Sequence, residues 1–185
     1  GLGGKAMIYK GDYLAAKDMI NRGINVYAEK GRTDPVAIVY EGMPYLYLND
    51  IENAKRVFNR VYEIDPENSW SIIGKTYIEL ITGQFTSARN RINILEKRQI
   101  HDSEMVYRFA HFYSFLGEFD KAIDALEYSV EEGFFCYSYI ASDPFTKPIH
   151  NNPRFKSILE KAKIRQELYV KRFGAEIKSL IGMPS

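Results

Sequence analysis

Apolar residues recur at helical spacing in two neighbouring stretches between Ser103 and Phe134, separated by the break Leu116-Gly117-Glu118. The first stretch carries Val106, Phe109, Ala110 and Tyr113, and the second carries Phe119, Ala122, Ile123, Leu126 and Val130. This spacing predicts two amphipathic helices, and Gly117 supplies the backbone freedom that a tight turn between them needs. A hairpin with one apolar seam cannot bury that seam alone, so the pattern predicts further copies of the hairpin.

The same pattern returns along the chain with a period close to 34 residues. Turn residues mark four copies, and a small residue follows each turn by five positions; both series have spacings of 38, 34 and 34. The turn residues are Gly11, Asn49, Gly83 and Gly117, and the small residues are Ala16, Ala54, Ala88 and Ala122. Small residues let two helices approach closely, and stacked hairpins bury a continuous core. The sequence therefore predicts an all-α solenoid of antiparallel helical hairpins.

These columns resemble the tetratricopeptide repeat. That family's pattern has a bulky residue, Leu, Gly and Tyr in the first helix, Ala, Phe and Ala in the second, and Pro at the end. Residues 35–68 show Ile38, Gly42, Tyr45, Ala54, Phe58 and Pro66; residues 67–102 show Trp70, Ile73, Gly74, Tyr77, Gly83, Phe85 and Ala88; residues 103–136 show Val106, Phe109, Ala110, Tyr113, Gly117, Phe119 and Ala122. The resemblance implies a right-handed superhelix in which first helices line a concave face and second helices a convex face.

The whole chain is interpreted as one domain, residues 1–185. Its expected divisions are a partial repeat at 5–33, repeats with overlapping boundaries at 35–68, 67–102 and 103–136, a degenerate repeat with a capping helix at 137–174, and a tail at 175–185. Because the first repeat begins in its middle, we expect the chain to be a piece of a longer protein.

The second full repeat departs from the pattern. Tyr77 and Gly83 are six positions apart, whereas Tyr113 and Gly117 are four apart. We interpret this difference as a two-residue extension before the turn. The alternative register buries two charged residues, which is unfavourable without partners; these are Lys75 and Glu79.

After Gly133 the pattern decays. Pro144 and Pro148 exclude a long regular helix. Asn152 is placed to cap a last helix, whose apolar stripe runs toward Phe173. Gly174 fits the end of that helix. The run SDPFTKPIHNNPRFKSILEK also resembles the close of repeat domains at the C-terminal end of some bacterial multidomain regulators.

Composition and the absence of known motifs narrow the classes of function that the sequence supports. A formal net charge of +1 gives no support for binding nucleic acid, which needs a basic field. The single Cys136 excludes an internal disulfide. No HExxH pair, Cys/His cluster, phosphate-binding glycine loop or GxSxG elbow occurs, so we expect no metal, no cofactor, no catalytic residue and no enzymatic activity. No apolar run reaches the roughly 18–20 residues that a membrane span needs, and the working expectation is a cytoplasmic protein.

A concave groove is the expected binding site. First-helix positions that point away from the seam should reach it, and such exposed aromatics and Met would anchor a peptide. The candidates are Met43, Tyr47, Ser71, Lys75, Glu79, Tyr107, Arg108, His111 and Phe115. Packing against adjacent helices is the alternative for each apolar member.

We therefore expect a protein–protein interaction scaffold of a larger regulatory protein, which binds a peptide or a partner domain in the groove. A regulatory domain that senses a small molecule among the aromatics of 107–140 is the alternative. Self-association through the N-terminal apolar face around Ile8, Tyr9 and Tyr13 is a further hypothesis.

Overall fold

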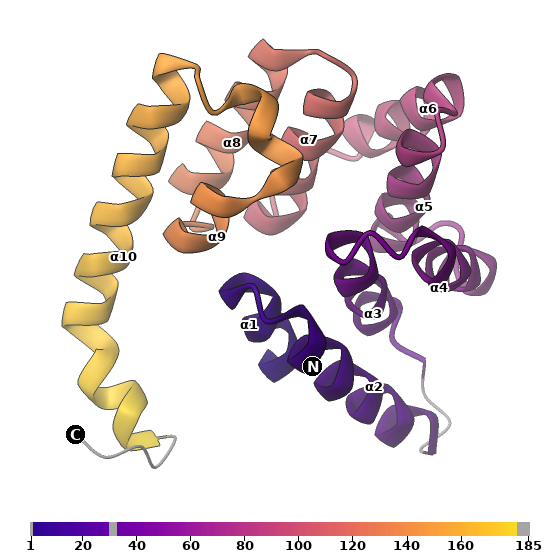
Figure 1. The fold of residues 1–185 in the computed structure, drawn as a ribbon, viewed down its shortest axis with the longest axis horizontal. Helices are drawn as coiled ribbons and strands as arrows, with labels where there is room; N and C mark the ends of the chain where they lie inside the picture. Colours follow the sequence, from indigo (N-terminus) through magenta and orange to yellow (C-terminus); the bar gives the residue numbers. More distant parts are fainter. Residues whose placement is uncertain (1, 30–32, 181–185) are drawn as a thin grey trace.

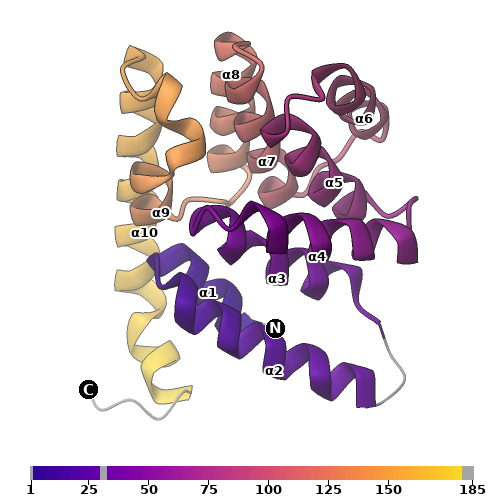
Figure 2. The same cartoon turned by 45° about the vertical axis from the view of Figure 1, so that its right-hand side comes forward.

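The fold is a curved stack of helices, seen in a computed structural model that describes residues 2–29 and 33–180 (Figures 1 and 2). The helices are α1 (Leu2–Lys10), α2 (Tyr13–Glu29), α3 (Pro35–Tyr47), α4 (Ile51–Ile64), α5 (Ser69–Ile81), α6 (Phe85–Lys97), α7 (Ser103–Phe115), α8 (Phe119–Glu131), α9 (Tyr137–Ser142), the 3₁₀ helix η1 (Pro144–Ile149) and α10 (Pro153–Leu180). Successive helices pack as hairpins. The prediction of an all-α solenoid is confirmed.

The repeat of 34 residues is constant from α3 onward. First helices begin at residues 35, 69, 103 and 137, and second helices begin at residues 51, 85, 119 and 153. The turns between first and second helices use the expected residues. Asn49 and Gly83 both have positive φ, at 57° and 76°, in the left-handed region that Gly and Asn tolerate best.

The expected two-residue extension in the second repeat is absent. α5 has 13 residues, as do α3 and α7. The structure adopts the alternative register, in which Glu79 is buried, because the buried carboxylate has a partner. Glu79 is 3% exposed, and Arg91 Nε donates to its carboxylate at 2.8 Å. A carboxylate that accepts charge-assisted hydrogen bonds can be buried.

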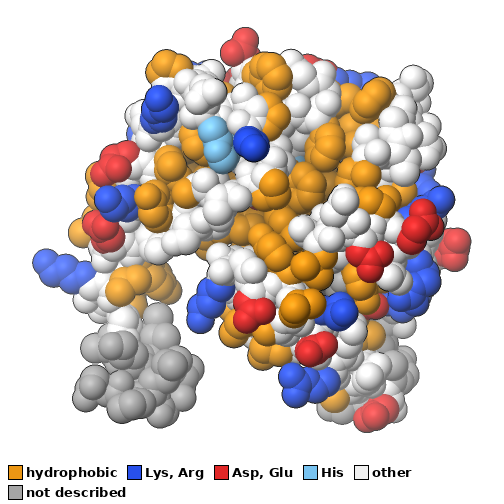
Figure 3. All heavy atoms as spheres, in the orientation of Figure 1, with side chains coloured by type: hydrophobic (Ala, Val, Ile, Leu, Met, Phe, Trp, Pro, Cys, Tyr) orange, Lys and Arg blue, Asp and Glu red, His pale blue; other side chains and the backbone are white. Residues whose placement is uncertain are grey.

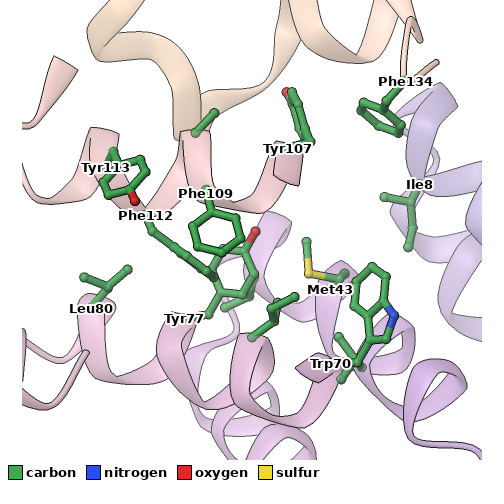
Figure 4. Close-up of a cluster of buried hydrophobic side chains, with 14 of the residues drawn as sticks. Ile8, Met43, Trp70, Tyr77, Leu80, Tyr107, Phe109, Phe112, Tyr113 and Phe134 are labelled. Atoms are coloured by element: carbon green, nitrogen blue, oxygen red, sulfur yellow. The ribbon is translucent and has the colours of Figure 1, made fainter. Parts of the chain in front are cut away.

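The seam between the first two full repeats is organised around Phe58, which is fully buried. Its ring lies between Gly42 of α3 and Gly74 of α5. A Cβ added at Gly42 would lie 2.6 Å from Phe58 Cζ, and one added at Gly74 would lie 2.6 Å from Cδ1. Both positions therefore need a residue without a side chain. Figure 4 shows Tyr77, Phe112, Trp70 and Met43 in the surrounding buried cluster.

The fourth repeat has a broken first helix. Residues 137–149 match α3, α5 and α7 in length and register, but α9 ends at Ser142 and η1 continues from Pro144. Asp143 stands at the break and accepts a hydrogen bond from the Phe145 N–H at 3.0 Å. The prolines break this helix as predicted, and the break turns Asp143 toward the inside of the stack.

The two ends of the repeat region meet. α1 contacts α3 and α9, and the Tyr9 ring lies 4.9 Å from the Tyr139 ring and 5.5 Å from the Phe134 ring. Ile8 is fully buried, and Tyr9 and Tyr13 are half-buried. The residues proposed for self-association thus pack within the chain, and self-association stays a prediction.

The last helix is longer than expected. α10 has 28 residues and continues through Gly174 to Leu180, so the helix end expected at Gly174 is wrong. Its first half packs on α8 and α9 through Phe155, Ile158 and Ala162, which are buried. The predicted tail at 175–185 is helical up to Leu180, and residues 181–185 lie outside the described part. No helix among the described residues is long and apolar enough to cross a membrane.

Candidate functional site

The predicted groove residues divide into two groups by burial. Six are buried: Met43, Ser71, Glu79, Tyr107, Arg108 and His111. Three are half-buried: Tyr47, Lys75 and Phe115. The inner side of the solenoid is therefore filled by the chain's own side chains, and only Tyr47 and Phe115 among the aromatic candidates reach its surface.

Ser71, Lys75 and Glu79 do not join the other candidates. Their polar atoms face the second helices: Ser71 Oγ donates to the Val61 carbonyl at 3.3 Å, and Lys75 Nζ donates to Asn59 Oδ1 at 2.7 Å. The cause is the two-residue shift assumed for this repeat. With the constant period, the residue equivalent to Met43 and His111 is Tyr77, which sequence reasoning missed.

Asp143 is a centre of the buried polar network. The carboxylate is 1% exposed and accepts from the Tyr107 hydroxyl at 2.9 Å and from the Tyr47 hydroxyl at 3.3 Å. His111 Nε2 also lies 2.9 Å from Asp143 Oδ2, although it is not aligned as a hydrogen-bond donor. The other ring nitrogen, His111 Nδ1, lies 2.6 Å from the Tyr77 hydroxyl. The broken first helix thus joins α3, α5 and α7.

A second centre is Glu104 at the start of α7. Its carboxylate accepts from the hydroxyls of Tyr9 and Tyr40, pairs with Lys5, and accepts from Arg108 Nη2 at 3.1 Å. Arg108 is 1% exposed, and its Nη1 donates to the Tyr139 hydroxyl at 2.9 Å. Because a buried guanidinium is costly without partners, these contacts fix α1, α7 and α9 relative to one another.

Burial sets the protonation of the His111–Asp143 pair. Burial lowers the pKa of His111 below its ordinary value of 6.5, and Asp143 only partly opposes this. Burial also raises the pKa of Asp143, but the His111 ring, the Phe145 N–H and the Tyr107 hydroxyl outweigh it and leave that pKa below 3.8. A neutral imidazole beside an ionised carboxylate follows at neutral pH.

Acid is therefore expected to destabilise the domain. The unfolded chain binds a proton at His111 more readily than the folded chain does, because the pKa of His111 is lower in the folded state. The contribution of the neutral His111 side chain to the stability of the fold is therefore complete above pH 6.5 and falls as the pH drops below that value. Urea unfolding across this pH range measures the effect. His111→Gln should flatten the profile there, whereas His101→Gln, which removes an exposed histidine, should leave it unchanged. An unchanged slope in His111→Gln contradicts the assignment.

A row of half-buried aromatic side chains joins α2, α3, α7 and η1. Tyr13 of α2 stacks on Tyr47 at 4.6 Å between ring centroids, Tyr47 lies 5.0 Å from Phe145 of η1, and Phe145 lies 5.7 Å from Phe115. All four side chains of this aromatic row are half-buried, so each keeps an exposed edge. Figure 3 shows hydrophobic side chains gathered in a band across the middle of the viewed face.

Sequence reasoning found Tyr47 and Phe115 of the aromatic row, because they stand 68 residues apart at equivalent helix ends. It missed Phe145, because this residue lies in η1, just after the break in the first helix of the fourth repeat, where the sequence pattern of the repeat is interrupted. Asp143 also caps η1, because it accepts from the Phe145 N–H. No sequence signal pointed to its contacts with Tyr107 and His111.

Chemistry beyond binding has little support in the described part of the chain. No group of three or more His, Cys, Asp or Glu side chains there is arranged to hold a metal ion. Cys136 is half-buried, and burial raises the pKa of its thiol, with Glu104 adding to the effect. A raised pKa disfavours the reactive thiolate.

Helical hairpins stacked at a constant period define this domain as an α-solenoid. Residues 42–68 and 103–131 match the model of the family described as "Tetratricopeptide repeat". Those two segments are tetratricopeptide repeats, as their sequence columns predicted.

Two further comparisons add little. A solved structure titled "MamA RS-1 ArsTM double mutant" is similar, with 16% sequence identity, a TM-score of 0.45, and coverage of 88% of this chain and 92% of that one. No curated protein matches the chain.

Proposed function

We propose that this domain is a protein–protein interaction scaffold that meets its partner at the aromatic row. Tetratricopeptide repeats generally mediate such interactions. The observation that carries the proposal is the convergence of Tyr13, Tyr47, Phe115 and Phe145 from four different elements onto one strip. Aromatic side chains held rigidly in this way dominate binding energy at protein interfaces.

The partner in this proposal is a peptide or a partner domain that lies across the row rather than in the centre of the solenoid. The centre is filled, because Tyr107, Arg108 and His111 contact Asp143 and Tyr139 of the fourth repeat. Deeper entry requires the displacement of η1. A role in a larger bacterial regulator is part of the same proposal and is supported by the resemblance of residues 142–161 to the ends of such proteins.

Peptides selected from a displayed library on the immobilised domain provide the test. We expect Tyr13→Ser with Phe115→Ser to weaken a selected peptide at least about tenfold, while circular dichroism stays helical. The matched control is Leu14→Ser with Phe119→Ser, which removes two apolar side chains that are close in sequence to the tested pair and are 63% and 45% exposed. Equal effects of the two pairs on the dissociation constant would exclude the aromatic row as the binding surface.

A further inference from the structure

Between residues 165 and 173, α10 presents an apolar surface that the other described residues leave partly exposed. Figure 1 shows this part of α10 running beyond α8 and α9. The stripe that packs on those helices through Ile158 and Ala162 continues at helical spacing to Tyr169 and Phe173. Leu168 is 60% exposed and Tyr169 is 48% exposed. A helix of this length is not needed to cap the solenoid, because its first half already does so.

This surface contains a shallow, open pocket of about 380 Å³, which we call the α10 pocket. It is lined by Phe135, Arg165, Leu168, Tyr169, Arg172 and Phe173. The rings are held in place by one another: Phe135 lies 6.0 Å from Tyr169, and Tyr169 lies 4.9 Å from Phe173. Aromatic walls that are already ordered lose little side-chain entropy on binding.

Basic groups frame the α10 pocket. The Arg165 guanidinium lies 4.9 Å from the Phe135 ring centroid, and the Arg172 guanidinium lies 5.0 Å from the Phe173 ring centroid. Arg165 is anchored, because its Nη1 donates to the Val130 carbonyl at 2.6 Å at the end of α8. Arg165 and Arg172 are the charged residues that line the pocket, and no acidic residue lines it, so the pocket itself is positive.

We propose that the α10 pocket binds an amphipathic helix of a partner protein whose apolar ridge is flanked by Asp and Glu. The apolar ridge packs on Leu168, Tyr169 and Phe173, and the acidic flanks meet Arg172 and Lys171. This site is separate from the aromatic row and does not depend on it.

Two other occupants fit less well. A second copy of this chain would place Lys171 and Arg172 of two α10 helices against each other, and like charges in contact oppose pairing. An anionic membrane would satisfy the charge, but Phe135 lines the pocket from outside α10, whereas a helix on a lipid surface binds through its own apolar face.

The test uses the full chain and two synthetic helical peptides of about 20 residues with Leu at positions i, i+3, i+4 and i+7. One peptide has Glu on both flanks of the Leu ridge and the other has Lys. We expect the Glu peptide to bind at least about tenfold more tightly than the Lys peptide by calorimetry. Leu168→Ser should weaken the Glu peptide by a similar factor, and Arg172→Glu should remove the preference between the peptides.

Val170→Ser is the matched control, because Val170 is 59% exposed on the same helix turn but does not line the pocket; it should leave binding unchanged. Equal binding of the two peptides, or equal effects of Leu168→Ser and Val170→Ser, overturns the proposal. Cosedimentation of the chain with phosphatidylserine vesicles, with no binding of either peptide, also overturns the proposal. A dimer in light scattering that Leu168→Ser dissociates assigns the surface to self-association and also overturns it.

Discussion

Asp143→Ala is expected to destabilise the domain by about 3–5 kcal/mol, because each buried donor that loses its acceptor costs about 1–3 kcal/mol. The Asp143 carboxylate accepts from Tyr107 and Tyr47 and lies beside His111. Without it, the buried Tyr107 hydroxyl and the half-buried Tyr47 hydroxyl lose an acceptor at once, and each unsatisfied group adds to the cost. Urea unfolding followed by circular dichroism measures the loss.

The cost of losing the η1 cap must be separated from the cost of losing the buried contacts, because Asp143 also accepts from the Phe145 N–H at the start of η1. Asp102→Ala is the control: Asp102 caps α7 by accepting from the Met105 N–H at 2.8 Å and is exposed. Loss of such a cap costs about 1 kcal/mol. If Asp143→Ala costs no more than Asp102→Ala, the buried contacts do not stabilise the fold in the way argued.

The consequence for function lies in the link between Asp143 and the aromatic row. The carboxylate holds the start of η1 against α3 and α7, and Phe145 follows two residues later between Tyr47 and Phe115. Asp143→Ala should therefore also disorder the middle of the aromatic row. A partner that binds the aromatic row would bind this variant more weakly, in proportion to the fraction of chains in which η1 is displaced.

The sequence predicted the repeat well because its markers are required by backbone geometry and close packing. Asn49 and Gly83 hold positive φ in the turns, and Ala54 and Ala88 are fully buried. Such positions accept few residue types, so their period survives in one sequence. The helix starts follow that period from residue 35 to residue 153.

The candidate site was less predictable because pairing can reverse the cost of burying a charge. Glu79 was expected to avoid the interior, but Arg91 of the next helix neutralises it, and the wrong register followed for Ser71 and Lys75. Likewise Tyr107 and His111 were expected to face an open groove. They face Asp143 and Phe134 instead, because the fourth repeat and α1 close the inner side, and a repeat pattern carries no information about that closure.

Phe58→Ala is the other substitution expected to have a large effect, about 3–5 kcal/mol. The Phe58 ring is fully buried between the backbones of Gly42 and Gly74, and neither glycine has a side chain that could move into the space. The remaining void therefore cannot collapse easily, which places the cost at the upper end for such a truncation. Phe119→Ala, at a 45% exposed ring, is the control and should cost less than about 1 kcal/mol.

Gly42→Ala tests the same contact from the other side, and its effect should depend on which residue occupies position 58. With Phe58 present, the added Cβ collides with the ring, so we expect a loss of about 1–3 kcal/mol. With Phe58→Ala, the methyl group enters the void and the helix gains up to about 1 kcal/mol from replacing Gly, so the substitution should be neutral or stabilising. Gly174→Ala, where a Cβ meets only Val170 at 3.5 Å, should not depend on position 58. If a double-mutant cycle shows no coupling between positions 42 and 58, the Phe58 ring of α4 does not set the distance to the α3 backbone at Gly42.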